Sequence, residues 1–220
     1  KKLAEGIYRM TLETPKSEFT RPGQFAMVEV PDKFLRRPIS VSSYDSSRYT
    51  LIYKVVGEGT DIMSRMEPGD YVKGITGLGN GYDLDKIPDG AYLIGGGIGI
   101  PPMLGLLKAM VMAGKSCKMV LGYNSADEMF MLEDFEHFSD DITVMTADGS
   151  YGQKGFVTDA FDKCEYACAC GPLPMLRALD HKVERGQFSL EARMGCGFGA
   201  CMGCSIRTVD GSQRVCKEGP

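Results

Sequence analysis

The sequence contains no apolar run approaching the roughly 20 residues that cross a bilayer, and it has no internal repeats or low-complexity segments. Its net charge is only −4, so it has no general attraction to nucleic acid or anionic lipid. Histidine is scarce, with two residues, and no constellation of His or paired carboxylates for acid–base catalysis is recognisable. We therefore expect neither a nucleic-acid-binding protein nor a membrane protein.

The chain is nevertheless long enough to build a substantial core. Its 220 residues are 43% hydrophobic, which allows two ordinary domains and a small appendage. Eight cysteines without a recognisable secretory leader suit a reducing compartment, and we expect a cytoplasmic protein.

Four cysteines near the C-terminus carry the strongest signal. Four residues separate the first pair, two separate the second and eleven separate the third. The first three have the plant-type spacing of [2Fe–2S] ligands, with the fourth thiolate returning from a short excursion. Glycines between them allow the backbone to wrap around inorganic sulfur and to expose amide donors. The predicted cluster ligands are Cys196, Cys201, Cys204 and Cys216.

The cysteines could also form a zinc site, a set of disulfides or a second metal site, and their spacing favours none of these. A structural zinc site usually has two separated Cys-x-x-Cys knuckles, and this segment has one. A disulfide framework belongs to small secreted chains with little core. Cys164, Cys168 and Cys170 could suggest a second metal site, but on a buried strand they are better explained as small hydrophobic residues.

The first third of the chain reads as short strands separated by turns. Pro and Gly interrupt the β-leaning runs at regular intervals, which is typical of a small antiparallel barrel. A short helix at 59–66, capped by Thr60 or Asp61, precedes the last strand. The predicted strands are 6–13, 24–30, 39–43, 49–56 and 70–76.

From Ala91 onward, strands and helices alternate, which indicates a doubly wound α/β domain with a parallel sheet. The predicted strands are 91–94, 118–122, 142–146 and 166–170, and the predicted helices lie at about 102–112, 132–138 and 172–184. The fold class is therefore a multidomain α+β protein. Its predicted parts are a β-barrel domain at 1–88, an α/β domain at 89–190 and a cysteine-rich subdomain at 191–220.

A glycine-rich loop follows the first strand of the α/β domain and opens a helix, the context in which a turn binds phosphate. It lacks the G-x-G-x-x-G spacing of dehydrogenases, and Pro101 or Pro102 fits the first turn of the helix. The segment 122–127 offers no Arg or Lys for a 2′-phosphate, so NAD is favoured over NADP, with 148–150 as a second candidate lining segment. The predicted nucleotide-binding glycines are Gly95, Gly96, Gly97 and Gly99.

The order of these parts resembles the ferredoxin–NADP reductase superfamily and, within it, the electron-transfer subunits of class B dihydroorotate dehydrogenases. The resemblance covers nearly the whole chain. Besides the glycine-rich loop and the four cysteines, it rests on Arg37-Pro38-Ile39-Ser40, Ile52-Tyr53-Lys54, Gly59-Thr60 and Cys170-Gly171-Pro172.

The resemblance implies that these segments bind FAD and NAD. Arg37 would hold the flavin pyrophosphate and Ser40 would reach the flavin ring. Ile39 stands where the superfamily usually has Tyr, and Tyr53 would supply the aromatic contact instead. Gly59 and Thr60 would offer helix-terminal amides to phosphate, and Cys170 would face the nicotinamide.

The same resemblance implies an oxidoreductase subunit of pyrimidine (UMP) biosynthesis. Electrons would pass from the FMN of a dihydroorotate dehydrogenase catalytic subunit through [2Fe–2S] and FAD to NAD⁺, in a heterotetramer of two chains of each kind. Phe198 and Met202 would belong to the docking face. The alternative within this chemistry is an NAD(P)H-dependent reductase subunit that serves sulfite reductase, hydrogenase or ferredoxin. A non-catalytic protein with a zinc-stabilised tail is the alternative from another class.

Overall fold

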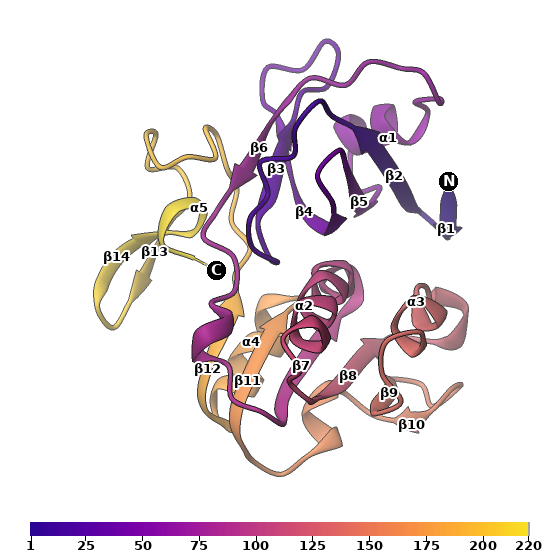
Figure 1. The fold of residues 1–220 in the computed structure, drawn as a ribbon, viewed down its shortest axis with the longest axis vertical. Helices are drawn as coiled ribbons and strands as arrows, with labels where there is room; N and C mark the ends of the chain where they lie inside the picture. The colour runs from indigo at the N-terminus through magenta and orange to yellow at the C-terminus, as the bar shows by residue number, and fades with distance from the viewer. Residues whose placement is uncertain (220) are drawn as a thin grey trace.

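The computed structural model describes residues 1–219, which form three β-sheets (Figure 1). The first sheet has six antiparallel strands in the order β1-β2-β5-β4-β3-β6. It is the antiparallel first domain expected from the sequence. Its strands are β1 (Lys2–Ala4), β2 (Ile7–Glu13), β3 (Phe25–Val28), β4 (Arg37–Tyr44), β5 (Arg48–Lys54) and β6 (Gly74–Leu78).

The strand bounds in this domain differ from the sequence-based expectation by up to four residues, and strand β1 was not predicted. The last strand begins at Gly74 rather than near Asp70, because the Asp70 carboxylate accepts a 2.8 Å hydrogen bond from the Glu67 N–H and closes a turn. The short helix is α1 (Glu58–Ser64), and its N-cap is Gly57. Thr60 is therefore not the cap, but its Oγ1 accepts hydrogen bonds from the N–H groups of Val56 and Gly57.

The second sheet is parallel, in the order β10-β9-β8-β7-β11-β12, and is the doubly wound domain expected. Successive residues of β7 bury on opposite faces: Leu93 packs in the core beneath α2, and Ile94 packs in the core beneath α4. The elements are β7 (Ala91–Gly96), α2 (Ile100–Met112), β8 (Cys117–Tyr123), α3 (Leu132–Glu136), β9 (Ile142–Thr146), β10 (Gln153–Lys154), β11 (Cys164–Cys170), α4 (Leu173–Asp180) and β12 (Val183–Ser189).

Strand β12 is the main element that the sequence-based analysis missed. The helix predicted at 172–184 ends at Asp180, and β12 then pairs in parallel with β11 at the sheet edge. Its sequence includes Glu184, Arg185 and Gly186, so it lacks a strand-like apolar pattern. Gly186 is required by close packing, because a Cβ there would lie 2.3 Å from the Ala167 carbonyl oxygen.

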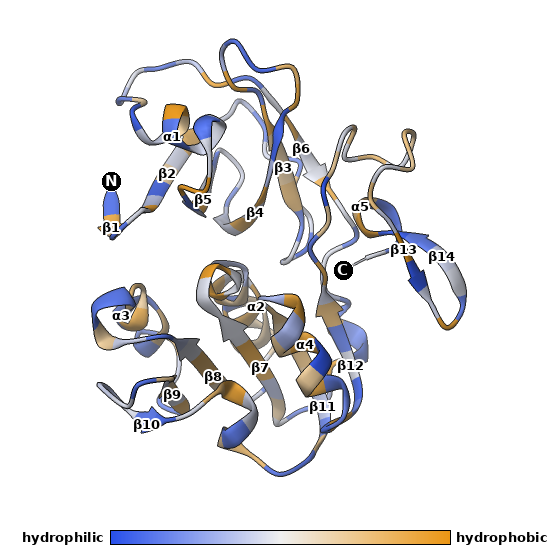
Figure 2. Cartoon of the chain, turned by 180° about the vertical axis from the view of Figure 1, so that it is seen from behind, coloured by the Kyte–Doolittle hydropathy of each residue, from blue (hydrophilic) through white to orange (hydrophobic). Residues whose placement is uncertain are grey.

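The two larger sheets share a continuous core. Ile7 and Ile52 of the first sheet belong to the same buried cluster as the inner face of α2, which also contacts β4. Gly105 lets α2 approach closely, since a Cβ there would lie 2.9 Å from the Ser42 carbonyl oxygen. In Figure 2 the central strand β7 is largely hydrophobic, whereas the edge strand β10 is hydrophilic. The shared core fixes the relative position of the two domains.

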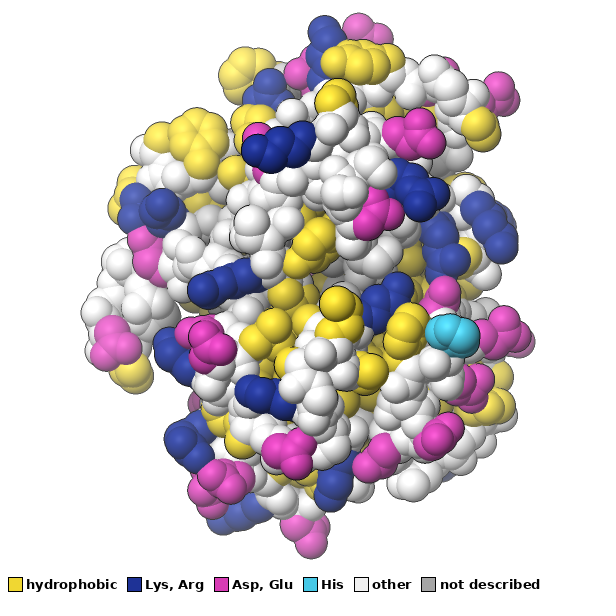
Figure 3. Space-filling view, in the orientation of Figure 1, with side chains coloured by type: hydrophobic (Ala, Val, Ile, Leu, Met, Phe, Trp, Pro, Cys, Tyr) yellow, Lys and Arg dark blue, Asp and Glu magenta, His cyan; other side chains and the backbone are white. Residues whose placement is uncertain are grey.

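The C-terminal unit consists of the hairpin β13 (Ser205–Thr208) and β14 (Gly211–Arg214), followed by α5 (Val215–Glu218). It lies beside β3 and β6 (Figure 1), where Cys204, Val215 and Cys216 share a buried cluster with Phe25 and Met27. Figure 3 shows hydrophobic side chains near the middle of this face, and side chains of both charges are mixed around them. No helix within residues 1–219 is both long enough and apolar enough for a membrane span.

Candidate functional site

A groove of about 380 Å³ lies where the two domains and the C-terminal unit meet. Its walls come from β4 and β5, from the start of α2, from the ends of β11 and β12, and from the segment that leads to the cysteine loop. The structure thus brings together most of the residues predicted to bind FAD with the cysteine predicted to face the nicotinamide. The predicted residues that line the groove are Arg37, Pro38, Ile39, Ser40, Ile52, Tyr53, Lys54, Thr60 and Cys170.

The Arg37 side chain lies directly against the backbone of Gly59. A Cβ on Gly59 would lie 2.3 Å from Nε of Arg37 and 2.5 Å from its Cζ, so the guanidinium occupies the volume that any larger residue would need. The same guanidinium donates a hydrogen bond to the Leu35 carbonyl. Gly59 therefore does not line the groove, but it allows Arg37 to do so.

Tyr53 is the predicted aromatic residue that lines the groove. It is 3% exposed, and its ring stacks on Tyr8 with a centroid separation of 6.2 Å. Burial raises the pKa of the Tyr53 hydroxyl to about 12, so it is neutral at ordinary pH. A neutral, buried ring suits apolar contact with a flat ligand. Lys54, next to it, is exposed and also lines the groove.

The predicted glycine loop adjoins the groove but contributes other residues to its wall. Ile98 and Pro102 line the groove, whereas the predicted glycines do not. The glycines serve close packing and backbone shape. A Cβ on Gly96 would lie 2.4 Å from Met175 Sδ. A Cβ on Gly99 would lie 2.3 Å from the Cys170 carbonyl oxygen. Gly97 has a φ of +51°, in the left-handed region that favours glycine. A Cβ on Gly95 would lie 2.9 Å from Ile100 Cα.

Cys170 ends β11 and is 7% exposed. Burial raises the pKa of its thiol to about 12, and hydrogen bonding with Ser189 opposes this only partly, so the thiol is neutral. Ser189 is its in-register neighbour on β12 and lines the same groove. The other buried cysteines of the parallel-sheet domain, Cys117, Cys164 and Cys168, have raised pKa values for the same reason, burial, as expected for apolar packing.

Several lining residues were not predicted from the sequence. Ser189 and Glu191 flank the groove where β12 ends, and burial raises the pKa of the Glu191 carboxyl. Their position depends on the register of β11 with β12, for which no local motif gives a signal. The other unpredicted lining residues are Gly23, Phe25, Val56, Ile98, Pro102, Leu190, Ala192, Met194 and Val215.

The four predicted cluster cysteines lie in one C-terminal unit as two pairs. Cys204 and Cys216 are buried, with their sulfurs 3.2 Å apart. Cys196 and Cys201 form the outer pair, in which the Cys201 N–H approaches Cys196 Sγ at 3.5 Å, and Cys201 is exposed. No group of three or more His, Cys, Asp or Glu within residues 1–219 gathers as a site for one metal ion. Two thiolate pairs fit a binuclear cluster, in which each iron takes two protein ligands.

The cysteine loop also has the donors and backbone shape that such a cluster needs. Hydrogen bonds from backbone amides, chiefly that of Cys201, lower the pKa of Cys196 to about 6 and favour its thiolate. Burial, together with the neighbouring Cys204, raises the pKa of Cys216 to about 11, so its deprotonation depends on metal binding. Gly197 and Gly199 have φ of +82° and +91°, a region that favours glycine.

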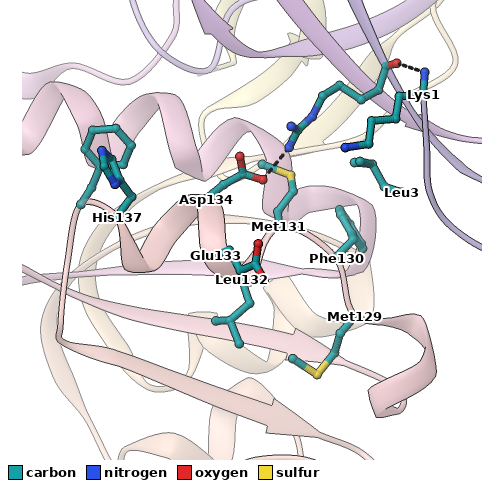
Figure 4. A pocket seen from close by; sticks show the side chains of 11 residues that line it. Lys1, Leu3, Met129, Phe130, Met131, Leu132, Glu133, Asp134 and His137 are labelled. Atoms are coloured by element: carbon teal, nitrogen blue, oxygen red, sulfur yellow. Dashed lines mark hydrogen bonds and ion pairs between the residues drawn. The ribbon is translucent and has the colours of Figure 1, made fainter.

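A second cavity, of about 590 Å³, lies on another part of the domain boundary (Figure 4). It is lined by Leu3 and Arg9 of the first domain and by the segment around α3. It contains none of the predicted site residues, and its Asp134 is paired with Arg9 at 2.5 Å. The ion pair joins the two domains, and we assign the cofactor chemistry to the groove.

Comparisons with known proteins agree with this geometry. Residues 191–220 match the iron–sulfur cluster binding domain of dihydroorotate dehydrogenase B, and residues 93–181 match the oxidoreductase NAD-binding domain. The dihydroorotate dehydrogenase B (NAD⁺) electron transfer subunit of Fusobacterium nucleatum is 40% identical over 99% of this chain and 91% of its own length. That of Lysinibacillus sphaericus is 38% identical over 100% and 92%. The solved NADH-dependent reduced ferredoxin–NADP oxidoreductase aligns with a TM-score of 0.90 and 30% identity, over 100% of this chain and 84% of that one.

Together, these findings define an oxidoreductase of the ferredoxin–NADP reductase type, with a flavin domain, an NAD domain and an iron–sulfur region. Within that class, the chain belongs to the family of dihydroorotate dehydrogenase B electron transfer subunits. The predicted family, fold class and cofactor set are thereby confirmed.

Proposed function

We propose that this chain passes electrons from the FMN of a catalytic partner, through the cysteine loop and the groove, to NAD⁺. Dihydroorotate would lose two electrons and two protons on the partner, and NAD⁺ would take up both electrons with one proton while the other proton enters the solvent. FAD exchanges hydride with nicotinamide and single electrons with a [2Fe–2S] cluster, so it must lie between them.

The proposal rests on one observation: the buried cysteine pair lies directly behind a wall of the groove. Val215 lines the groove, and the next residue is Cys216, which is 2% exposed. The buried pair, Cys204 and Cys216, thus lies on the groove side of the loop, and exposed Cys201 lies on the solvent side. This polarity supports electron entry at the outer pair, where Cys201 is exposed, and delivery to the groove at the buried pair.

For FAD, the proposal assigns the pyrophosphate to Arg37, whose guanidinium is held across Gly59. Ser40 would hydrogen-bond the flavin ring, and Tyr53 would pack against it from the buried side of the groove. Cys170 stands across the groove from these strands, on the NAD-binding domain. A neutral thiol there would contact the nicotinamide without adding charge to the hydride path.

For the adenosine end of NAD, we propose the edge of the parallel sheet where β8 and β9 end. The Ala126 N–H donates a 2.7 Å hydrogen bond to Ser150 Oγ, which joins the two candidate lining segments. Asp148 accepts hydrogen bonds from Ser150, and these lower the pKa of its carboxyl. Lys154 also approaches this turn and lowers that pKa further. The carboxylate supports NAD over NADP, because it repels a 2′-phosphate, whereas the nearby Lys154 ammonium partly offsets that repulsion.

The partner is proposed to dock over the cysteine loop. Phe198 and Met202 flank Cys201 and are 54% and 53% exposed, as expected for a docking face. The family name supports a catalytic partner, and we propose an FMN subunit in a heterotetramer of two chains of each kind. We also propose the domain division 1–88, 89–190 and 191–220, and a cytoplasmic location, which eight free thiols suit.

Anaerobic co-expression with a dihydroorotate dehydrogenase catalytic subunit tests this function. The purified complex should contain FAD, iron and acid-labile sulfide in this chain, and should reduce NAD⁺ when dihydroorotate is added. Phe198→Glu should abolish co-purification and dihydroorotate-dependent NAD⁺ reduction while NADH-to-dye activity stays intact. Val209→Glu, at an exposed position on the β13–β14 turn, is the matched control. Failure of the wild-type chain to bind the subunit would refute the dihydroorotate pathway.

A second candidate is a reductase subunit that serves another acceptor. The similarity to the NADH-dependent reduced ferredoxin–NADP oxidoreductase structure favours it. In that case the isolated chain should transfer electrons from NADH to oxidised ferredoxin, two ferredoxins being reduced for each NADH oxidised, and Phe198→Glu should impair that transfer rather than dihydroorotate oxidation.

A further inference from the structure

Arg214 joins the two parts of the C-terminal unit that carry the cysteines. It ends β14 and lies two residues before Cys216. Its Nη1 donates a 2.8 Å hydrogen bond to the Gly199 carbonyl, and its Nε lies 3.1 Å from both carboxylate oxygens of Glu218. The Arg214 N–H also donates to Glu218 at 2.6 Å. One guanidinium therefore links the loop of the first three cysteines to the helix of the fourth.

The loop is shaped to accept this link. Gly199 lies between Cys196 and Cys201 and has φ +91°. A Cβ there would lie 3.1 Å from Lys217 Cβ and 3.3 Å from Arg214 Nη1, so glycine lets the loop pack on α5. With the loop held at the Gly199 carbonyl, the neighbouring amides stay directed at Cys196 Sγ. Arg214 thus contributes to the geometry of the outer pair although it contacts neither of its sulfurs.

The charge of Arg214 also acts on the inner pair. Arg214 lies two residues before Cys216, and its guanidinium is bonded to the Gly199 carbonyl of the cysteine loop, so its charge lies close to the cysteines. Its side chain is only 29% exposed, so solvent screens this charge incompletely. A [2Fe–2S] cluster with four thiolates is anionic, and reduction adds further negative charge. A nearby positive charge stabilises the reduced form more than the oxidised form. The Glu218 carboxylate opposes this effect, because it partly neutralises the guanidinium.

We propose that Arg214 is a positioning residue that holds the cysteine loop through the Gly199 carbonyl and raises the reduction potential of the cluster, while Glu218 limits that rise. The inference rests on the proposed function, since it requires the [2Fe–2S] cluster on these cysteines. The proposal assigns opposite effects on the reduction potential to the two paired side chains, Arg214 and Glu218. If the salt bridge only held the structure together, removing either partner would not shift the potential in opposite directions.

A redox titration of the complete holoprotein, in which electron paramagnetic resonance measures the reduced cluster at each potential, tests the proposal. Arg214→Gln should shift the one-electron equilibrium toward the oxidised cluster about tenfold, a fall of about 59 mV in midpoint potential. Glu218→Gln should shift it in the opposite direction. Arg214→Lys should keep most of the potential, because it keeps the charge, but amide hydrogen exchange in 196–204 should accelerate. Lys217→Gln, which removes a neighbouring exposed charge, is the control and should shift the potential much less.

The outcomes separate the two levels of inference. Absence of a reduced [2Fe–2S] signal in the wild-type protein would refute the proposed function. A normal wild-type signal with unchanged potentials, or with shifts of the same sign in Arg214→Gln and Glu218→Gln, would overturn the role of Arg214 alone. If Arg214→Gln loses its cluster, Glu218→Gln decides, and an unchanged potential in that variant overturns the proposal.

Discussion

Replacement of Gly59 by alanine should weaken FAD binding although the residue does not line the groove. The new Cβ would fall 2.3 Å from Nε and 2.4 Å from Nη2 of Arg37, which is far inside van der Waals contact. The flexible arginine can move more easily than the α1 backbone, so the guanidinium should leave its position. The loss should equal that of a hydrogen bond to a charged group, about 1.5 to 3 kcal/mol, or roughly 10- to 150-fold in Kd.

Two features of the site make this test specific. Alanine is a better helix former than glycine by about 1 kcal/mol, so Gly59→Ala should not destabilise α1 itself. Gly57→Ala is the matched control, because a Cβ at that N-cap position meets nothing within 4 Å.

The assay is FAD affinity measured by flavin fluorescence on the apoprotein. Arg37→Ala should reproduce the Gly59→Ala loss, and the double variant should lose little more, because both changes remove the same contact. Full FAD affinity in Gly59→Ala, or strictly additive losses in the double variant, would refute the role of Arg37 as the pyrophosphate ligand.

The other predictions concern the cluster, the thiol and the domain boundary. Cys216→Ser should lower bound iron and acid-labile sulfide while FAD stays bound, and unchanged metal content would contradict the ligand assignment. Cys170→Ala should slow flavin reduction by NADH in rapid mixing with normal cluster content, and an unaltered rate would leave Cys170 as a packing residue. Asp134→Asn should lower the free energy of unfolding in urea by about 1 kcal/mol, since its pair with Arg9 is partly buried, with side chains 34% and 27% exposed, and FAD and cluster content should not change. No loss of stability in Asp134→Asn would show that the ion pair contributes nothing.

The elements that the sequence predicted well are those with local signals. Strand β9 has the predicted bounds, Ile142–Thr146, because a short segment rich in β-branched residues between polar turns is typical of a strand. The cysteine loop was predictable for a different reason: cluster chemistry constrains ligand spacing regardless of the surrounding fold. Both signals lie within one short, continuous stretch of the chain.

The features that the sequence did not reveal depend on contacts between distant segments. Strand β12 is polar, and its pairing with β11 depends on Gly186 fitting against Ala167. Ser189 and Glu191 reach the groove only because of that pairing. The division of the cysteines into a buried and an exposed pair was equally hidden, because it depends on the packing of Cys204 and Cys216 against β3.

The connection between the two large domains explains how one groove can be assembled from separate units. Tyr82, fully buried, donates its backbone N–H to the Pro22 carbonyl of the first domain and its hydroxyl to the Ala169 carbonyl, one residue before Cys170. In the same connection, Asn80 donates hydrogen bonds to the Lys217 and Gly219 carbonyls of the C-terminal unit. Residues 80–82 thus form hydrogen bonds with the first domain, with the parallel-sheet domain and with the C-terminal unit. Because electron transfer depends on the separations between cofactors, we expect these hydrogen bonds to hold the groove, the Cys170 thiol and the cysteine loop at fixed separations.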